Sequence, residues 1–397
     1  MSTRRDSKAA LILMVLSAGI LLQAVVHAEP HKPQFQIVEI DGSPGKVVYA
    51  VTHADVDGDG DTDLVALTEN RVIWYEQPSW KPHVILQDQL PLDHVCIAAQ
   101  DITGDGKVDF AIGAGWPRGG SLYWIHRTED PQALWQVESI GEEQSIHRMH
   151  WADVLGKGRP QLVVSPLNAS QGDGVRLLAF EIPGSPARER WPSTVLSANL
   201  NRMHNHLHLD FDGQGAIDTI AASREGLTLI RRDGDGWQGK SLASGKSGQG
   251  DINQNGAGEI RVGRLGNGRR FLVAVQPMHG DELAVYCEPA EAGAAWEPLI
   301  IHSGFRRGHA LRTADFDGDG DDEIVFGHSD TPEKFGVMVW SSTDADGAHW
   351  DAVVLDEGEV ATEDVTVADF NGDGRPDIAS GGRATHNVRM YLNRTPQ

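Results

Sequence analysis

Short apolar runs alternate with short polar loops along most of the chain, and no stretch repeats apolar residues at the spacing of a long amphipathic helix. In the first clear unit, β-branched and apolar runs occupy residues 47–54, 64–68, 72–76 and 83–87, with turn residues between them. Four such strands in about 50 residues is the spacing of one blade of a β-propeller. The pattern therefore predicts an all-β chain and disfavours a fold that alternates helices with strands.

One loop in each unit sets the register of the repeat, because it follows the first strand every time. The loops begin, in chain order, at Asp55, Asp101, Asp153, Asp210, Gly263, Asp315 and Asp369. The intervals range from 46 to 57 residues, so seven units fill residues 30–395 as one domain, a seven-bladed β-propeller. A rival fifth loop at residues 251–256 gives less even intervals, and we reject it as a repeat loop, although its oxygens could still bind an ion. Residues 30–45 are expected to add an outer strand to the last blade and so to lock the ring.

The loop at residues 55–63 has oxygen-bearing side chains at alternate positions around a glycine and ends in a carboxylate, which is the arrangement that Ca²⁺ needs. Five of the seven loops keep enough of this pattern to be candidate calcium sites after the innermost strands. Their predicted ligands are Asp55, Asp57, Asp59 and Asp63; Asp101, Asp105 and Asp109; Asp210, Asp212 and Asp218; Asp315, Asp317, Asp319 and Glu323; and Asp369, Asn371, Asp373 and Asp377. The copies at residues 152–166 and 262–277 keep the frame and have lost the ligands. We expect several structural Ca²⁺ ions, which stabilise a fold because they bind folded loops and not unfolded ones.

The N-terminus has the pattern of a secretory signal. Arg4, Arg5 and Lys8 precede an apolar run that ends near a small-residue cleavage site at residues 26–28. Residues 1–28 are therefore predicted to be a signal peptide and the mature protein to be periplasmic or secreted; an uncleaved membrane anchor is the alternative, because the run is long enough to span a bilayer. Removing this segment takes away three basic residues and one acid and changes the formal net charge from −23 to −25. Nucleic acid and anionic membranes are therefore poor partners.

Counting back six residues from each loop start selects one position in every innermost strand: Tyr49, Val95, His147, His204, Ala257, His309 and Glu363. Equivalent positions of a closed ring meet at its axis, so we expect these side chains at the mouth of the central channel, on the face opposite the calcium loops. The turns on that face carry histidine, arginine and tryptophan, where glycine, asparagine, aspartate and proline are the usual turn residues. The candidate catalytic residues are therefore His147, His204, His279, His309 and Glu363. The candidate substrate-binding residues are His94, Trp116, Arg148, His328 and Arg383.

Two chemistries fit this set of residues. Histidines can act as general acid and base, because their ordinary pKa lies near neutrality. Alternatively, His147, His204 and His309 could ligate a transition metal that polarises a carbonyl group. Either way, elimination of water next to a carbonyl is within reach, since His, Arg and Glu together can take a proton, stabilise an enolate and protonate a leaving hydroxyl. The sequence lacks the motifs of P-loop, dinucleotide-binding, serine-hydrolase and zinc-protease enzymes.

Two resemblances narrow this interpretation. The loops ADVDGDG, ADFDGDGDDEIVFG and ADFNGDGRPDIASGG resemble FG-GAP/VCBS repeats, which implies a calcium-binding propeller and says little about activity. The segments DHVCIAAQDITGDGKVDFAIGAGW, IHRMHWADV, RFLVAVQPMHGDELAVY and RRGHALRTADFDGDGDDEIVFGH resemble the propeller domain of the aldos-2-ulose dehydratases. That family consists of carbohydrate lyases that act on keto-sugars such as anhydrofructose, and its propeller carries histidine-dependent elimination of water. The resemblance would place His147, His204, His279 and His309 in or near the active site.

The sequence ends at Gln397 without the C-terminal cupin domains of that family, so we expect no isomerase step that depends on those domains. We expect an exported carbohydrate lyase or dehydratase that acts on a keto-sugar at the channel mouth. In this hypothesis Arg148 and Glu363 orient the substrate. The alternative is a non-catalytic propeller that binds glycans or proteins, as integrin-type propellers do, and does not convert its ligand.

Overall fold

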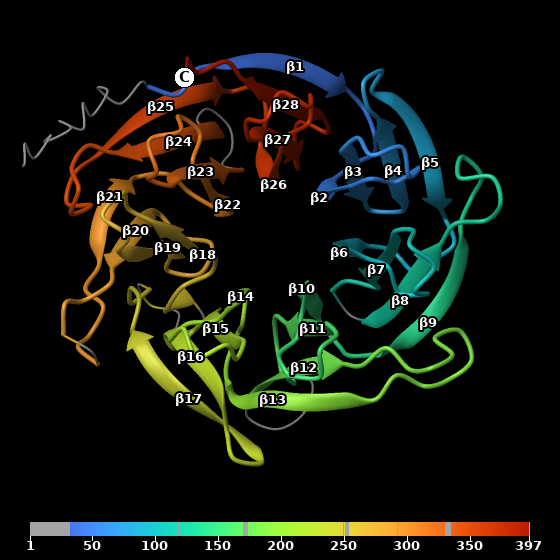
Figure 1. Cartoon of the computed structure of the whole chain (residues 1–397), viewed down its shortest axis with the longest axis horizontal. Helices are drawn as coiled ribbons and strands as arrows, with labels where there is room; N and C mark the ends of the chain where they lie inside the picture. The colour runs from blue at the N-terminus through green and yellow to red at the C-terminus, as the bar shows by residue number, and fades with distance from the viewer. Residues whose placement is uncertain are drawn as a thin grey trace, which may run out of the picture. The chain divides into compact units, whose positions relative to one another are not determined.

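The computed structural model describes residues 32–117, 119–169, 174–248, 250, 254–291, 293–329 and 335–396. These residues form seven antiparallel sheets of four strands each around a central axis, as Figure 1 shows. The prediction of an all-β, seven-bladed propeller is confirmed. The predicted signal peptide, residues 1–28, lies outside the described residues, as do residues 251–253 of the rejected loop. Within the described ranges, no helix is long and apolar enough to cross a membrane.

Each blade is a meander of four neighbouring strands, and the strand named first lies nearest the axis (Figure 1). The first three blades are β2 (Val48–Ala54), β3 (Asp63–Thr68), β4 (Arg71–Glu76) and β5 (Lys81–Gln87); β6 (His94–Gln100), β7 (Asp109–Ala114), β8 (Ser121–His126) and β9 (Gln136–Glu142); and β10 (Ile146–Ala152), β11 (Gln161–Pro166), β12 (Val175–Phe180) and β13 (Ser193–Leu200). The next three are β14 (Asn205–Leu209), β15 (Asp218–Ser223), β16 (Gly226–Asp233) and β17 (Gly236–Ala243); β18 (Ile260–Arg264), β19 (Arg270–Gln276), β20 (Glu282–Cys287) and β21 (Leu299–Ser303); and β22 (Gly308–Ala314), β23 (Glu323–His328), β24 (Gly336–Ser342) and β25 (Trp350–Glu357). The last blade is β26 (Thr362–Ala368), β27 (Asp377–Gly382), β28 (Val388–Asn393) and β1 (Phe35–Asp41).

The core lies between neighbouring blades. The second strands β3, β7 and β15 are buried at every residue, which explains their continuous apolar runs. One apolar cluster, for example, joins Trp74 of the first blade to Phe110 and Trp135 of the second. The outermost strands β5, β9 and β17 have several exposed positions, because one of their faces meets solvent.

The ring is closed by the two ends of the described chain. Strand β1 pairs antiparallel with β28, from Phe35 opposite Asn393 to Asp41 opposite Val388, and so supplies the outer strand of the last blade. The expectation that residues 30–45 contribute such a strand is confirmed. Phe35 also packs edge-on against Phe316 of the sixth blade, with ring centroids 5.4 Å apart. The pairing of β1 with β28 covers the edge of β28 that an open ring would expose.

The fifth repeat loop lies where the sequence predicts it but begins two residues later. Pairing of β18 with β19 ends at Arg264 opposite Arg270, just as pairing of β2 with β3 ends at Ala54 opposite Asp63. Leu265 is therefore the counterpart of Asp55. Six residues before Leu265 lies Glu259, and not the Ala257 that the sequence count selects.

If β1 locks the ring, losing its buried contact should destabilise the whole molecule. We expect Phe35→Ala to lower the free energy of unfolding by roughly 2 kcal/mol, because a partly buried ring is removed from an interblade core. The matched control is Ile37→Ala in the same strand, which removes an exposed apolar side chain and should change stability by less than about 0.5 kcal/mol. Denaturant unfolding measures both, and equal effects of the two substitutions would contradict the locking role.

Candidate functional site

Five of the seven innermost strands carry a β-bulge at the same place. In β2, β6, β10, β22 and β26 the pairing with the second strand skips one residue, six positions before the loop. The skipped residues are Tyr49, Val95, His147, His309 and Glu363, and all five line one cavity. A bulge re-aims a side chain and is often found next to a functional site. Here it directs equivalent residues of different blades to the same space.

The fourth and fifth blades reach the same place without a bulge. His204 directly precedes β14, and its N–H donates to the carbonyl of Ala222 at 3.1 Å. Glu259 directly precedes β18, and its carbonyl accepts from the N–H of Val275 at 3.2 Å. Both side chains are buried. The site therefore receives one residue from the same structural position of every blade.

Four imidazoles converge at this mouth: His147, His204, His309 and, from the turn between β19 and β20, His279. One ring nitrogen of each lies within 4.8 Å of one ring nitrogen of every other. The Nε2 atoms of His204 and His279 are 2.6 Å apart, and the rings of His279 and His309 are stacked with their centroids 5.0 Å apart. The structure thus brings together the four histidines that the sequence singles out.

Neighbouring groups fix how two of these rings face the cluster. Nδ1 of His309 lies 2.6 Å from the backbone carbonyl of Glu363, so it donates its hydrogen there, and Nε2, which lies 3.6 Å from Oε1 of Glu363, carries the lone pair. Nδ1 of His204 lies 2.9 Å from Oε1 of Glu259, which leaves its Nε2 toward the cluster. A carboxylate or carbonyl behind a histidine is the usual outer support of a metal-ligating imidazole.

The donor set fits a divalent transition metal. His147 is buried, and neither of its ring nitrogens has a hydrogen-bond partner among the described residues. Leaving a buried polar group unpaired costs about 1–3 kcal/mol of stability. A ligand that bound one of the ring nitrogens of His147 would recover that cost. Three or four neutral imidazoles with outer support are a common ligand set for zinc and related ions. The four histidines are therefore a candidate metal site.

The electrostatics favour the neutral form of the rings. Burial lowers the pKa of all four histidines below the ordinary value. The Arg148 guanidinium lowers the pKa of His147 and His309 further, whereas the Glu259 carboxylate opposes the shift for His204. Neutral imidazole is the form that binds a metal ion.

A cavity of about 310 Å³ adjoins the cluster. It is also lined by Trp116, Arg148, Glu363 and Arg383, all of which the sequence proposes as site residues. The Trp116 ring lies 5.2 Å from that of His147, centroid to centroid, and Nη1 of Arg383 donates to Oε1 of Glu363 at 2.6 Å. The cavity volume suits a ligand of monosaccharide size.

Two predicted substrate-binding residues do not line this cavity. His94 is fully buried at the start of β6, because the next residue, Val95, takes the bulge position that faces the cavity. His328 ends the second strand β23, away from the axis, and packs against Phe305 and Phe326 beside a separate cavity of about 160 Å³. The placement of both residues at the site is therefore corrected.

Two residues that the sequence did not propose for the site belong to it. Glu259 contacts Nη2 of Arg148 at 3.2 Å as well as His204. Burial alone would raise the pKa of Glu259, but Arg148 and His204 outweigh that effect and hold it below the ordinary value. Tyr49 lines the cavity, and burial, followed by the nearby Asp93, raises its pKa to about 12, so it stays a hydrogen-bond donor at neutral pH. The corrected loop register would have identified Glu259, and the six-residue count already contained Tyr49.

On the opposite face, two of the five predicted calcium loops gather their carboxylates. Ligand oxygens lie within 4.8 Å of one another in the set Asp55, Asp57 and Asp63 and in the set Asp315, Asp317 and Glu323. Such clusters are candidate cation sites. The neighbouring Asp59 and Asp319 belong to neither set.

Protein groups compete for the carboxylates in the other three loops. Arg231 pairs with Asp212 at 3.2 Å and with Asp218 at 2.6 Å. In the last loop, Asp373 pairs with Arg375, and the amide of Asn371 donates to Asp377. In the second loop, Lys107 lies 4.0 Å from Asp105. None of these three loops forms a set as close as the two above within the described part of the chain.

A second histidine cluster lies further along the channel. The rings of His150, His206 and His208 are 4.8 to 6.3 Å apart, and burial lowers the pKa of His150 and of His208 to about 3. Each ring has a protein partner: Asn205 for His150, the Val163 carbonyl for His206 and Thr219 for His208. These contacts indicate a structural role and separate His206 from the four-histidine cluster.

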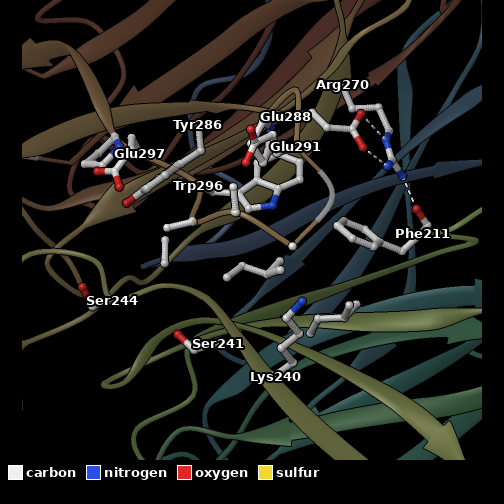
Figure 2. A pocket seen from close by; sticks show the side chains of 18 of the residues that line it. Phe211, Lys240, Ser241, Ser244, Arg270, Tyr286, Glu288, Glu291, Trp296 and Glu297 are labelled. Carbon is white, nitrogen blue, oxygen red and sulfur yellow. Dashed lines mark hydrogen bonds and ion pairs between the residues drawn. The ribbon is translucent and has the colours of Figure 1, made fainter.

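A larger groove of about 910 Å³ lies between the fourth and fifth blades, away from the axis (Figure 2). Two of its charged groups pair with each other: Arg270 forms an ion pair with Glu288 and also donates to the Phe211 carbonyl. Trp296 is buried against Phe211, with centroids 5.9 Å apart. The described residues that line the groove do not gather histidines or carboxylates into a set as close as the four-histidine cluster, so its size alone does not make it the site.

Comparison with known proteins agrees with the geometry. Residues 119–289 match the β-propeller domain of aldos-2-ulose dehydratase, and residues 55–112 and 315–380 match an FG-GAP-like repeat. Aldos-2-ulose dehydratase from Phanerodontia chrysosporium is 25% identical over 337 residues, which cover 77% of this chain and 37% of that protein. This chain is an FG-GAP-repeat propeller related to the propeller domain of aldos-2-ulose dehydratase.

The FG-GAP propeller spans just over a third of the length of that relative. Solved structures agree on the fold alone. The Dos1 propeller has a TM-score of 0.51 at 10% identity, covering 86% of this chain and 77% of its own. BBS1N, solved in complex with ARL6DN and soaked with lead, has a TM-score of 0.55 at 13% identity, covering 94% and 99%.

The second histidine cluster should make the FG-GAP propeller acid-labile. His150 and His208 have a folded-state pKa of about 3, below the unfolded value of about 6.5. Their contribution to stability is present above pH 6.5 and is lost as the pH falls from about 6.5 toward 3, because the unfolded chain takes up the proton first. We expect His208→Gln to reduce the number of protons taken up on unfolding in this range by up to about one. Urea unfolding at pH 7, 6, 5 and 4 measures this number. The control is His349→Gln, an exposed histidine; an unchanged slope for His208→Gln would contradict the assignment.

Proposed function

We propose that this FG-GAP propeller is a carbohydrate lyase that removes water from a keto-sugar. The reaction would take place in the cavity beside the four-histidine cluster, here called the four-histidine cavity, which His147, His279 and His309 line. The observation that carries the proposal is the convergence of four neutral imidazoles, two of them held from behind by Glu259 and the Glu363 carbonyl. The relationship to a named dehydratase supports it.

The reaction that fits these groups is an elimination next to a carbonyl. A base removes the proton on the carbon beside the ketone, and the C–H electron pair forms an enolate. The enolate re-forms the carbonyl as the C–O bond one carbon further breaks, and the leaving hydroxyl takes up a proton as water. The products are an unsaturated ketone and one water, so no oxidant or reductant is needed.

Each part of this reaction has a candidate residue. His147, His204 and His309 would hold a divalent metal, which when bound polarises the ketone of the substrate. His279 is the least buried of the four and faces the cavity, so we assign proton transfer to it. The Arg383 guanidinium, held by Glu363, is placed to stabilise negative charge on the enolate oxygen. Tyr49 is placed to donate to the leaving hydroxyl.

Replacing the central histidine tests this function. We expect His204→Ala to lower kcat/KM on a keto-sugar at least about 100-fold and to lower the bound transition metal, because His204 contacts both Glu259 and His279. His386→Gln, an exposed histidine on the same face, is the matched control and should keep both. Unsaturated ketone is followed by its ultraviolet absorbance and metal by elemental analysis. Tight binding of keto-sugar with no turnover by the unaltered protein would favour the non-catalytic alternative.

We also propose that residues 1–28 direct export.

We further propose that Ca²⁺ binds the loops at residues 55–63 and 315–323. Calcium should raise the melting temperature of the chelator-treated protein, since binding at 100 times Kd adds about 2.7 kcal/mol per site. Asp57→Asn and Asp317→Asn should each remove part of this gain. Asp212→Asn is the control, because Arg231 already pairs with that carboxylate. A melting temperature that does not respond to calcium would contradict the calcium sites.

A further inference from the structure

Positive charge surrounds the four-histidine cavity, although the whole chain carries a net charge of −23. Among the described residues, four arginines line the cavity, against a single lining carboxylate, Glu363. They are Arg148, Arg202, Arg307 and Arg383. A concave site lined by one sign of charge focuses its field on the ligand that enters.

Carboxylates neutralise only part of this charge. Arg148 pairs with Glu259 at 3.2 Å. Arg307 and Arg383 share the one carboxylate of Glu363, at 3.5 and 2.6 Å. Arg202 has no ion pair with any described residue, and its Nε atom is buried without a hydrogen-bond partner in the described chain. The four guanidinium groups that line the cavity thus form ion pairs with only two carboxylates among the described residues, Glu259 and Glu363.

The backbone at two of these arginines is strained. Arg202 and Arg307 each lie two residues before a cluster histidine, His204 or His309, and have φ values of +46° and +53°. Left-handed backbone is unfavourable for residues with a β-carbon, and glycine or asparagine would adopt it at lower cost. Met278, directly before His279, has φ +32° as well. Seven described non-glycine residues have positive φ, and four of them, Ser145, Arg202, Met278 and Arg307, lie one or two residues before a cluster histidine. This conformation is therefore shared by the turns that lead into the four-histidine cluster.

We propose that the substrate is an acidic keto-sugar, one that carries a carboxylate or phosphate group, and that Arg202 and Arg307 bind this group. The proposal rests on the proposed lyase function and names its substrate class. The planar guanidinium matches either anion in a two-pronged hydrogen bond, and the cavity of about 310 Å³ admits a single sugar unit. Arg383 remains for the enolate oxygen, because its Nη1 is already fixed on Glu363.

The test compares three sugars of the same carbon skeleton on the full chain: a neutral aldos-2-ulose, its 6-carboxylate and its 6-phosphate. Calorimetry measures binding, and the absorbance of the unsaturated ketone measures turnover. We expect at least one acidic sugar to bind at least 10-fold more tightly than the neutral one, with the advantage shrinking at high salt. Arg202→Gln should remove most of that advantage, while Arg202→Lys keeps part of it.

The matched control is Arg190→Gln, an exposed arginine outside the cavity, and thermal melting checks that each variant is folded. Neutral and acidic sugars that bind and react equally, with or without Arg202, would overturn the anion site and leave the lyase function standing. An acidic sugar that binds through Arg202 and never reacts would support the anion site and contradict the lyase. The tighter of the two acidic sugars identifies the anion as carboxylate or phosphate.

Discussion

The site depends on one constraint: the ring must close with seven blades in the same register. Closure by β1 on β28 fixes the blades around one axis, and the residue six positions before each loop, at a bulge in five blades, then points toward its equivalents in the other blades. His147, His204 and His309 are more than 50 residues apart in the sequence and meet only because of this repeat. A blade that slipped by one residue would turn its contribution to the opposite face of its sheet.

This convergence has an energetic cost. Burying imidazoles, guanidinium groups and carboxylates removes them from water, and each stays favourable only if it finds a partner. Glu259 supplies partners to both Arg148 and His204, so it holds the cluster together from the side away from the cavity. His147 has no such partner among the described residues, and the cavity beside it has more positive than negative groups. We therefore propose that the site accepts a metal ion on the imidazoles and an anionic group on the arginines.

The sequence predicted the blade count, the closing strand and the four histidines, because all three follow from the repeat period. It misplaced the residues for which local structure breaks that period. The fifth loop is shorter, so the count stopped at Ala257 and missed Glu259. The bulge in β6 points Val95 into the cavity and leaves His94 buried away from it. The sequence pattern did not mark this bulge. Two arginines form ion pairs with carboxylates that resemble calcium ligands: Arg231, from outside its loop, and Arg375, from within its loop. The sequence does not show these ion pairs.

We propose that the four histidines form a metal-binding catalytic centre on the propeller axis. Anomalous X-ray diffraction from crystals of the protein purified without chelator can detect such a metal. The expected result is a transition-metal peak bonded to Nε2 of His204 and His309 and to a ring nitrogen of His147, at about 2.0–2.1 Å. A site without anomalous signal after transition metals are supplied, or imidazoles that face away from one another, would contradict it.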